Sequence, residues 1–72
     1  MKIFIERLKY LRKQRNLTQE QMAENIKISL RGYRNYETGE KKPIVENLIA
    51  IADFFDVSLD YLVGRSDIQE RR

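Results

Sequence analysis

The residues best suited to chemistry in this 72-residue chain are cations and amides on one short segment, residues 30–38. Arg31, Arg34 and Asn35 are expected to face outward there, next to Leu30. Arginine can bond two acceptors of guanine, and asparagine can bond a donor and an acceptor of adenine. These residue types suit the reading of base edges. From the helical pattern alone, an ordinary solvated face is an equally good interpretation.

The composition argues for recognition rather than catalysis. The chain contains no histidine and no cysteine, which excludes zinc fingers, histidine acid–base chemistry and thiolate chemistry. No plausible nucleophile–base pair is present, so we expect no enzyme and no cofactor. The lack of cysteine fits the reducing cytoplasm, and no apolar run approaches the ~20 residues of a membrane span. We therefore expect a cytoplasmic protein that does not engage a membrane.

The formal charge of +3 is unevenly distributed. Eleven Lys or Arg and five Glu precede Pro43, whereas three Arg and six acidic residues lie beyond it. This asymmetry favours contact between the first part of the chain and an anionic polymer. Charge counts alone fit two solvated faces better.

Two helix-start signals, at Thr18 and Ser29, frame the candidate residues. Thr18 and Gln21 have the spacing of a capping box, and Ser29 is a second cap followed by a helix over about 30–38. Two short helices joined by about three residues form a helix-turn-helix, here over about 18–37. The tight turn sets the second helix across the first, so its outer side can enter a major groove.

The remaining elements are also helical. A first helix of about three turns carries Ile5, Leu8 and Leu11 and ends near Asn16. Pro43 suits the start of a fourth helix, and Ser58 caps a short fifth that stops at Gly64. The apolar stripe of the fourth helix contains Leu48, Ile51, Ala52 and Phe55, and that of the fifth contains Leu59 and Leu62. We predict an all-α fold of five helices, with one domain over 1–66 and a polar tail over 67–72; residues 65–72 are expected to fray.

The chain resembles the XRE family of phage Cro and repressor proteins over roughly residues 5–67. The resemblance rests on several submotifs in the right order, namely Leu17-Thr18-Gln19-Glu20-Gln21-Met22-Ala23, Ile28-Ser29, Tyr36-Glu37-Thr38-Gly39, Lys42-Pro43, Glu46-Asn47-Leu48 and Val57-Ser58-Leu59-Asp60-Tyr61-Leu62. It implies a compact five-helix bundle of the lambda-repressor-like type that binds operator DNA, often as a dimer.

The same resemblance assigns roles to individual positions. It implies a phosphate contact by Gln19, base reading by Leu30, Arg31 and Arg34 or Asn35, and further phosphate contacts by Lys41 and Lys42. The helix starts at Thr18 and Ser29 add backbone amides. It also implies an ion pair between Arg12 and Glu37 that holds the third helix against the first.

Some positions depart from the family pattern. Lys27 stands where the turn usually has glycine, and a lysine at positive φ there should cost about 1 kcal/mol. Leu30 replaces a polar reader, Gly32 lies inside the third helix, and Ile44 occupies a usual capping position. Gly32 either allows close approach to DNA or loosens the helix.

We therefore expect a sequence-specific transcriptional regulator of double-stranded DNA, a repressor that binds a palindromic operator as a homodimer. Ala50, Phe54 and Val63 fall off the inner stripes and either form a dimer contact or cover the core of the chain itself. The alternative is a protein-interaction module, such as an antitoxin or adaptor built on the same bundle. Regulation by a partner protein is compatible with either function.

Overall fold

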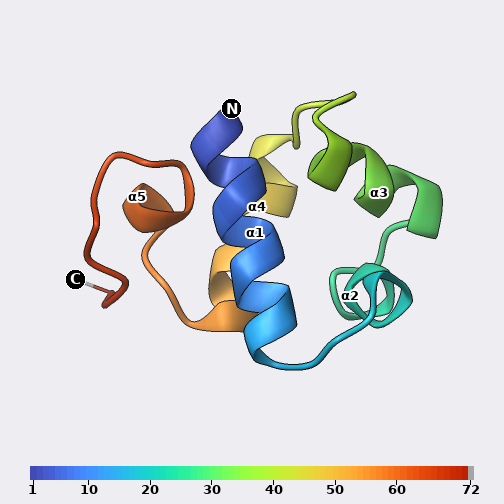
Figure 1. Cartoon of the computed structure of the whole chain (residues 1–72), viewed down its shortest axis with the longest axis horizontal. Coiled ribbons are helices and arrows are strands. Elements are labelled where there is room, and N and C mark those ends of the chain that lie inside the picture. Colours follow the sequence, from blue (N-terminus) through green and yellow to red (C-terminus); the bar gives the residue numbers. More distant parts are fainter. Residues whose placement is uncertain (72) are drawn as a thin grey trace.

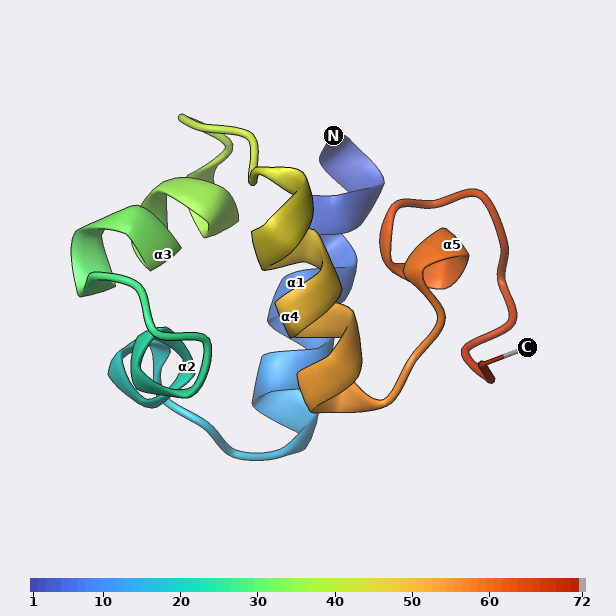
Figure 2. The ribbon, with the colours of Figure 1, turned by 180° about the vertical axis from the view of Figure 1, so that it is seen from behind.

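The computed structural model describes residues 1–71 as five α-helices, with no strand among them. The helices are α1 (Lys2–Gln14), α2 (Gln19–Asn25), α3 (Leu30–Thr38), α4 (Val45–Phe55) and α5 (Leu59–Leu62). Helix α1 runs through the middle of the molecule, with α2 and α3 on one side and α5 with the tail on the other (Figure 1). In the view from behind, α4 lies in front of α1 (Figure 2). The predicted all-α five-helix fold is confirmed.

The core lies where the helices meet. Its fully buried members come from every helix: Phe4 and Leu8 from α1, Met22 from α2, Tyr33 from α3, Ile51 from α4 and Leu62 from α5. On α1 the stripe is centred on Phe4, Leu8 and Leu11, and the predicted Ile5 is only partly buried at its edge. Residues at i, i+4 and i+7 share a helix face, so these three side chains of α1 enter the core from one side of the helix.

Local capping signals fix the helix ends. The Thr18 hydroxyl accepts from the Gln21 amide at 3.0 Å, and the Gln21 side chain accepts from the Thr18 amide at 2.9 Å. Ser29 caps α3 through the Gly32 amide at 3.0 Å. At the other end of α3, Gly39 adopts a left-handed conformation with φ 84°. These caps are as predicted.

Two residues that follow helices, Asn16 after α1 and Lys27 after α2, have a left-handed backbone conformation. Asn16 has φ 56° and Lys27 has φ 60°, as expected from residue type for Asn16 and from the family resemblance for Lys27. Helix α4 starts at Val45 with Ile44 at its N-cap and no side-chain cap bond, in line with the expected weak start. Pro43 thus precedes the helix rather than opening it.

The tail differs from the expected frayed segment. Arg7 of α1 donates to the Ser66 carbonyl at 2.7 Å and to Asp67 at 2.8 Å, and the Ser58 amide donates to the Gln69 carbonyl at 2.8 Å. Residues 65–71 therefore fold back along α5; Arg72 lies outside the described residues. Helix α5 buries Tyr61 and Leu62, and the predicted core residue Leu59 is 39% exposed.

No helix within residues 1–71 is long and apolar enough to span a bilayer.

Candidate nucleic-acid interface

Helices α2 and α3 carry the residues that the sequence singled out. The turn between them is closed by two backbone bonds, from the Lys27 amide to the Glu24 carbonyl at 3.2 Å and from the Ile28 amide to the Ala23 carbonyl at 3.0 Å. The Lys27 backbone at positive φ makes this short reversal possible. On the inner side of α3, Tyr33 is fully buried. The opposite side of α3 is consequently turned toward solvent.

Most of the candidate residues are exposed to solvent. Six are exposed: Thr18, Ser29, Arg31, Arg34, Lys41 and Lys42. Three are half-buried: Gln19, Leu30 and Asn35. The hydroxyls of Thr18 and Ser29 are engaged in capping, so their positions mark helix starts more than free side-chain donors. The cations among these residues are Arg31 and Arg34 on α3 and Lys41 and Lys42 in the loop that follows it, all exposed; they are called the positive strip below.

The loop after α3 is tied to the end of that helix. The Asn35 carbonyl accepts from the amides of Gly39 at 3.1 Å and Lys41 at 3.3 Å. On the other side of α3, Asn47 of α4 donates to the Tyr36 hydroxyl at 2.7 Å. These bonds fix the backbone from which Lys41 and Lys42 project and hold α3 to α4.

Arg12 and Glu37 form the ion pair that the family resemblance implied. Arg12 Nε donates to Glu37 Oε2 at 2.7 Å, and Nη2 donates to Oε1 at 3.1 Å. The side chains are 13% and 4% exposed. The remaining nitrogen of the guanidinium, Nη1, donates to the Leu17 carbonyl at 2.9 Å. Arg12 thus links three parts of the chain: α1, the segment that precedes α2, and α3.

The surroundings of Glu37 shift its titration. Burial raises the pKa of this carboxyl. Hydrogen bonds from Arg12, Tyr33 and Gln19 together lower the pKa by more than burial raises it, so the net pKa lies below the ordinary value. The hydrogen bond to Glu37 raises the pKa of Arg12. Burial, followed by the bond to Glu37, raises the pKa of the Tyr33 hydroxyl. Around neutral pH the cluster therefore holds one carboxylate, one guanidinium and one neutral phenol.

The cluster extends to the surface through Gln19. Its Nε2 donates to Glu37 Oε1 at 3.1 Å, and its Oε1 accepts from Arg34 Nε at 3.2 Å. Sequence reasoning placed Gln19, Arg34 and Glu37 correctly on their helices but did not find these bonds. Gln19 and Arg34 are fifteen residues apart, and only the crossing of α2 and α3 brings them together.

Of the two roles left open for the apolar residues near the carboxyl end, the structure shows packing on the chain's own core for Phe54 and Ala50. Phe54 packs on the core, with its ring 5.0 Å from that of Phe55 and the Arg15 guanidinium 5.5 Å from its centre. Ala50 also packs against the core. The more exposed apolar side chains of α4 are Val45 and Ile49, at 62% and 45%.

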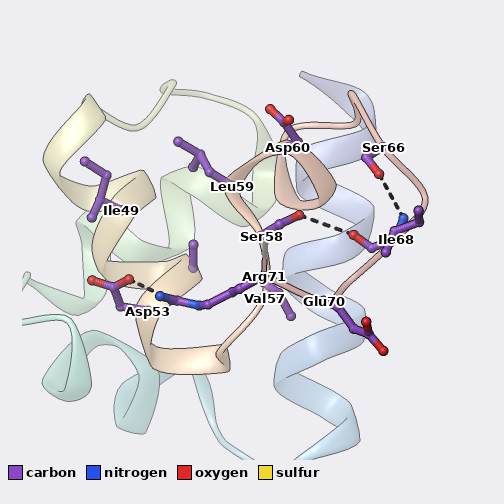
Figure 3. Close-up of a pocket in the computed structure, with 11 residues that line it drawn as sticks. Ile49, Asp53, Val57, Ser58, Leu59, Asp60, Ser66, Ile68, Glu70 and Arg71 are labelled. Carbon is purple, nitrogen blue, oxygen red and sulfur yellow. Dashed lines mark hydrogen bonds and ion pairs between the residues drawn. The ribbon is translucent and has the colours of Figure 1, made fainter.

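An open hollow of about 570 Å³ lies between α4, α5 and the tail. Ile49 and Leu59 flank it, Asp53 and Asp60 bring carboxylates to it, and Arg71 pairs with Asp53 at 2.7 Å (Figure 3). Carboxylates repel phosphate, and α5 lies across α1 from α3 in both overall views. The hollow is therefore separate from the positive strip.

Comparisons with known proteins match most of the chain. A family model described as helix-turn-helix covers residues 8–62. The cryptic phage CTXphi transcriptional repressor RstR of Vibrio cholerae is 53% identical over 60 residues, or 83% of this chain and 54% of that protein. The uncharacterized HTH-type transcriptional regulator YobD of Bacillus subtilis is 43% identical, covering 90% of this chain and 58% of that protein.

A solved structure agrees in fold as well as in sequence. The crystal structure of a transcriptional regulator from Listeria innocua superposes with a TM-score of 0.80 at 41% identity, over 85% of this chain and 57% of that one. The chain thus spans a little over half the length of these relatives. They are named as transcriptional regulators, in line with the expectation of a chain that is not an enzyme.

Proposed function

We propose that this chain, which belongs to the helix-turn-helix family, is a sequence-specific regulator that binds double-stranded DNA with α3 in the major groove. Its membership confirms the resemblance to the XRE family on which several site assignments depend. The observation that carries the proposal is the exposed cationic side of α3, with Arg31 and Arg34 outward and Tyr33 buried behind them.

Phosphate contacts and base contacts have different roles in the proposed complex. Lys41 and Lys42, exposed after α3, would bind phosphates, together with Gln19 and backbone amides in the first turns of α2 and α3, which Thr18 and Ser29 cap. These contacts supply affinity that falls as salt is added: the slope of log K against log salt concentration is about −0.9 for each neutralised phosphate. Base contacts supply choice of site.

Base reading falls to the outer side of α3. Arg31 suits guanine and Asn35 suits adenine. The half-buried Leu30 has no hydrogen-bonding group, which favours contact with a thymine methyl. Arg34 is a further reader, and its position is developed below.

We further infer that the protein represses transcription as a homodimer on a palindromic operator, in the cytoplasm. The relative named as a repressor supports the direction of regulation. Exposed Val45 and Ile49 offer an apolar surface for a two-fold contact. Two copies would set their α3 helices about 34–36 Å apart, one turn of DNA.

Selection from random duplex oligonucleotides with the purified protein tests the proposal. Recovery of one motif, repeated as an inverted pair one helical turn apart, supports both the site and the dimer. A single unpaired motif supports sequence-specific DNA binding and contradicts the proposed dimer. Binding that is salt-sensitive but blind to sequence contradicts a sequence-specific regulator and favours an adaptor.

A further inference from the structure

Gln19 has both ends of its side-chain amide engaged by groups of opposite character. Its Nε2 faces the carboxylate of Glu37 at 3.1 Å, and its Oε1 faces the Nε–H of Arg34 at 3.2 Å. An amide turned by 180° would set its oxygen against a carboxylate and its nitrogen against an N–H donor. Hydrogen-bond chemistry therefore allows only one orientation of this amide.

The carboxylate that orients Gln19 is itself held in place. Glu37 Oε1 also accepts from Arg12 Nη2, while Oε2 accepts from Arg12 Nε and from the Tyr33 hydroxyl. Because Glu37 is 4% exposed and bonded on both oxygens, it is a rigid reference point. A chain of bonds thus runs from the buried pair, through Gln19, to the exposed Arg34.

The bond to Gln19 restricts Arg34 in a useful way. The bond engages Nε of Arg34, and no hydrogen bond or ion pair engages Nη1 or Nη2 of this arginine within residues 1–71. The guanidinium is planar, so fixing Nε restricts the plane in which the terminal nitrogens lie. Those two nitrogens form the pair that bonds guanine O6 and N7.

We propose that Gln19 is a positioning residue for Arg34 and that it holds this arginine ready for a sequence-specific base contact. The inference rests on the proposed DNA-binding function and deepens it. Without Gln19, Arg34 would have to be ordered at the moment of binding, and fixing a long, flexible side chain lowers affinity. The buried carboxylate would thus support base reading at the surface.

A double-mutant cycle separates positioning from the phosphate contact of Gln19 itself. Affinities for the selected duplex and for a scrambled one are measured for the unchanged protein, Gln19→Ala, Arg34→Ala and the double variant. Loss of a phosphate contact is additive, whereas positioning makes the two losses overlap. We expect the double variant to bind the selected duplex at least about 3-fold more tightly than additivity predicts, with no such coupling on the scrambled duplex.

Arg31 provides the matched control. It lies on the same helix and is exposed, and no bond to Gln19 is present in the described chain. Gln19→Ala combined with Arg31→Ala should therefore be additive. Thermal melts of each variant check that the bundle still folds.

A measurement without DNA keeps the inference testable even if a variant binds weakly. In NMR spectra the Nε–H signal of Arg34 should shift and exchange faster with water in Gln19→Ala, while that of Arg31 stays unchanged. Additive effects of Gln19 and Arg34 on the selected duplex, equal coupling on both duplexes, or an unchanged Arg34 signal would each overturn the inference. If the unchanged protein selects no sequence, the proposed function fails first, and this inference with it.

Discussion

Arg12 and Glu37, twenty-five residues apart in the chain, meet through two hydrogen bonds of 2.7 and 3.1 Å. One is on α1 and the other near the end of α3, so their contact determines how α3 lies on the bundle. A buried ion pair is costly to form, but loss of one partner leaves the other charge buried and unpaired. The orientation of the proposed reading helix therefore depends in part on a buried carboxylate, 4% exposed.

Glu37→Ala should lower both the melting temperature and DNA affinity. The substitution leaves the Arg12 charge and the Tyr33 hydroxyl without their partner, which typically costs about 3–5 kcal/mol in the free energy of unfolding. Thermal melts followed by circular dichroism measure the effect. Glu40→Ala is the matched control, because Glu40 is exposed after α3, and it should change stability by less than about 0.5 kcal/mol. An unchanged melting temperature in Glu37→Ala would contradict this role.

The stability conferred by Glu37 should depend on pH in the acid range. Because its pKa is lowered in the folded state, the contribution is fully present above the ordinary carboxyl pKa of about 4.5 and is lost as pH falls below it toward the folded pKa. Urea unfolding of the unchanged protein and Glu37→Gln between pH 3 and pH 7 checks the sign. The stability advantage of the unchanged protein should be constant near neutrality and shrink below about pH 4.5. An advantage that grows on acidification would refute the assignment.

Lys27→Gly should stabilise the fold. Lys27 is held at φ 60°, where a residue with a Cβ is strained by about 1 kcal/mol relative to glycine. Greater freedom of glycine in the unfolded chain offsets part of the gain, so an increase below about 1 kcal/mol is expected in urea unfolding. Lys13→Gly, in the helical part of α1, should instead destabilise by about 0.5–1 kcal/mol. A loss of stability in Lys27→Gly would mean that the lysine side chain contributes more than its backbone strain costs.

Arg7→Ala should release the tail. Arg7 donates to the carbonyls of Tyr61 and Ser66 and to Asp67, and its guanidinium lies 4.1 Å from the centre of the Tyr61 ring. Its removal should cost about 1–3 kcal/mol through unpaired carbonyls. Hydrogen exchange of the Ser58 amide, which donates to the Gln69 carbonyl, should speed up more than exchange in α3. Equal protection before and after the substitution would show that the tail holds without this clamp.

Features set by neighbouring residues were predictable from the sequence. The caps at Thr18 and Ser29 and the left-handed Asn16 depend on residue type over one turn, and all appear as expected. The positive φ of Lys27 was expected only because the family resemblance implies glycine at that position. The Arg12–Glu37 pair came from the family resemblance and not from spacing, because twenty-five residues separate its members.

Features that depend on tertiary contacts were missed. The tail looked polar and unattached because its partner, Arg7, is on α1. Leu59 has the apolar character of a core residue, but Tyr61 and Leu62 are the ones that α5 turns inward. The bond between Gln19 and Arg34 requires the crossing of two helices, which residue types alone do not specify.

The central claim is that the outer side of α3 reads bases while the following loop binds the backbone. It is tested most directly by measuring the affinity of the unchanged protein, Arg31→Ala and Lys42→Ala for every single-base-pair variant of the selected duplex. We predict that Arg31→Ala loses about 1–3 kcal/mol of discrimination at one base pair, whereas Lys42→Ala weakens binding to all duplexes by the same factor. A uniform loss in Arg31→Ala, with discrimination intact at every position, would contradict the claim.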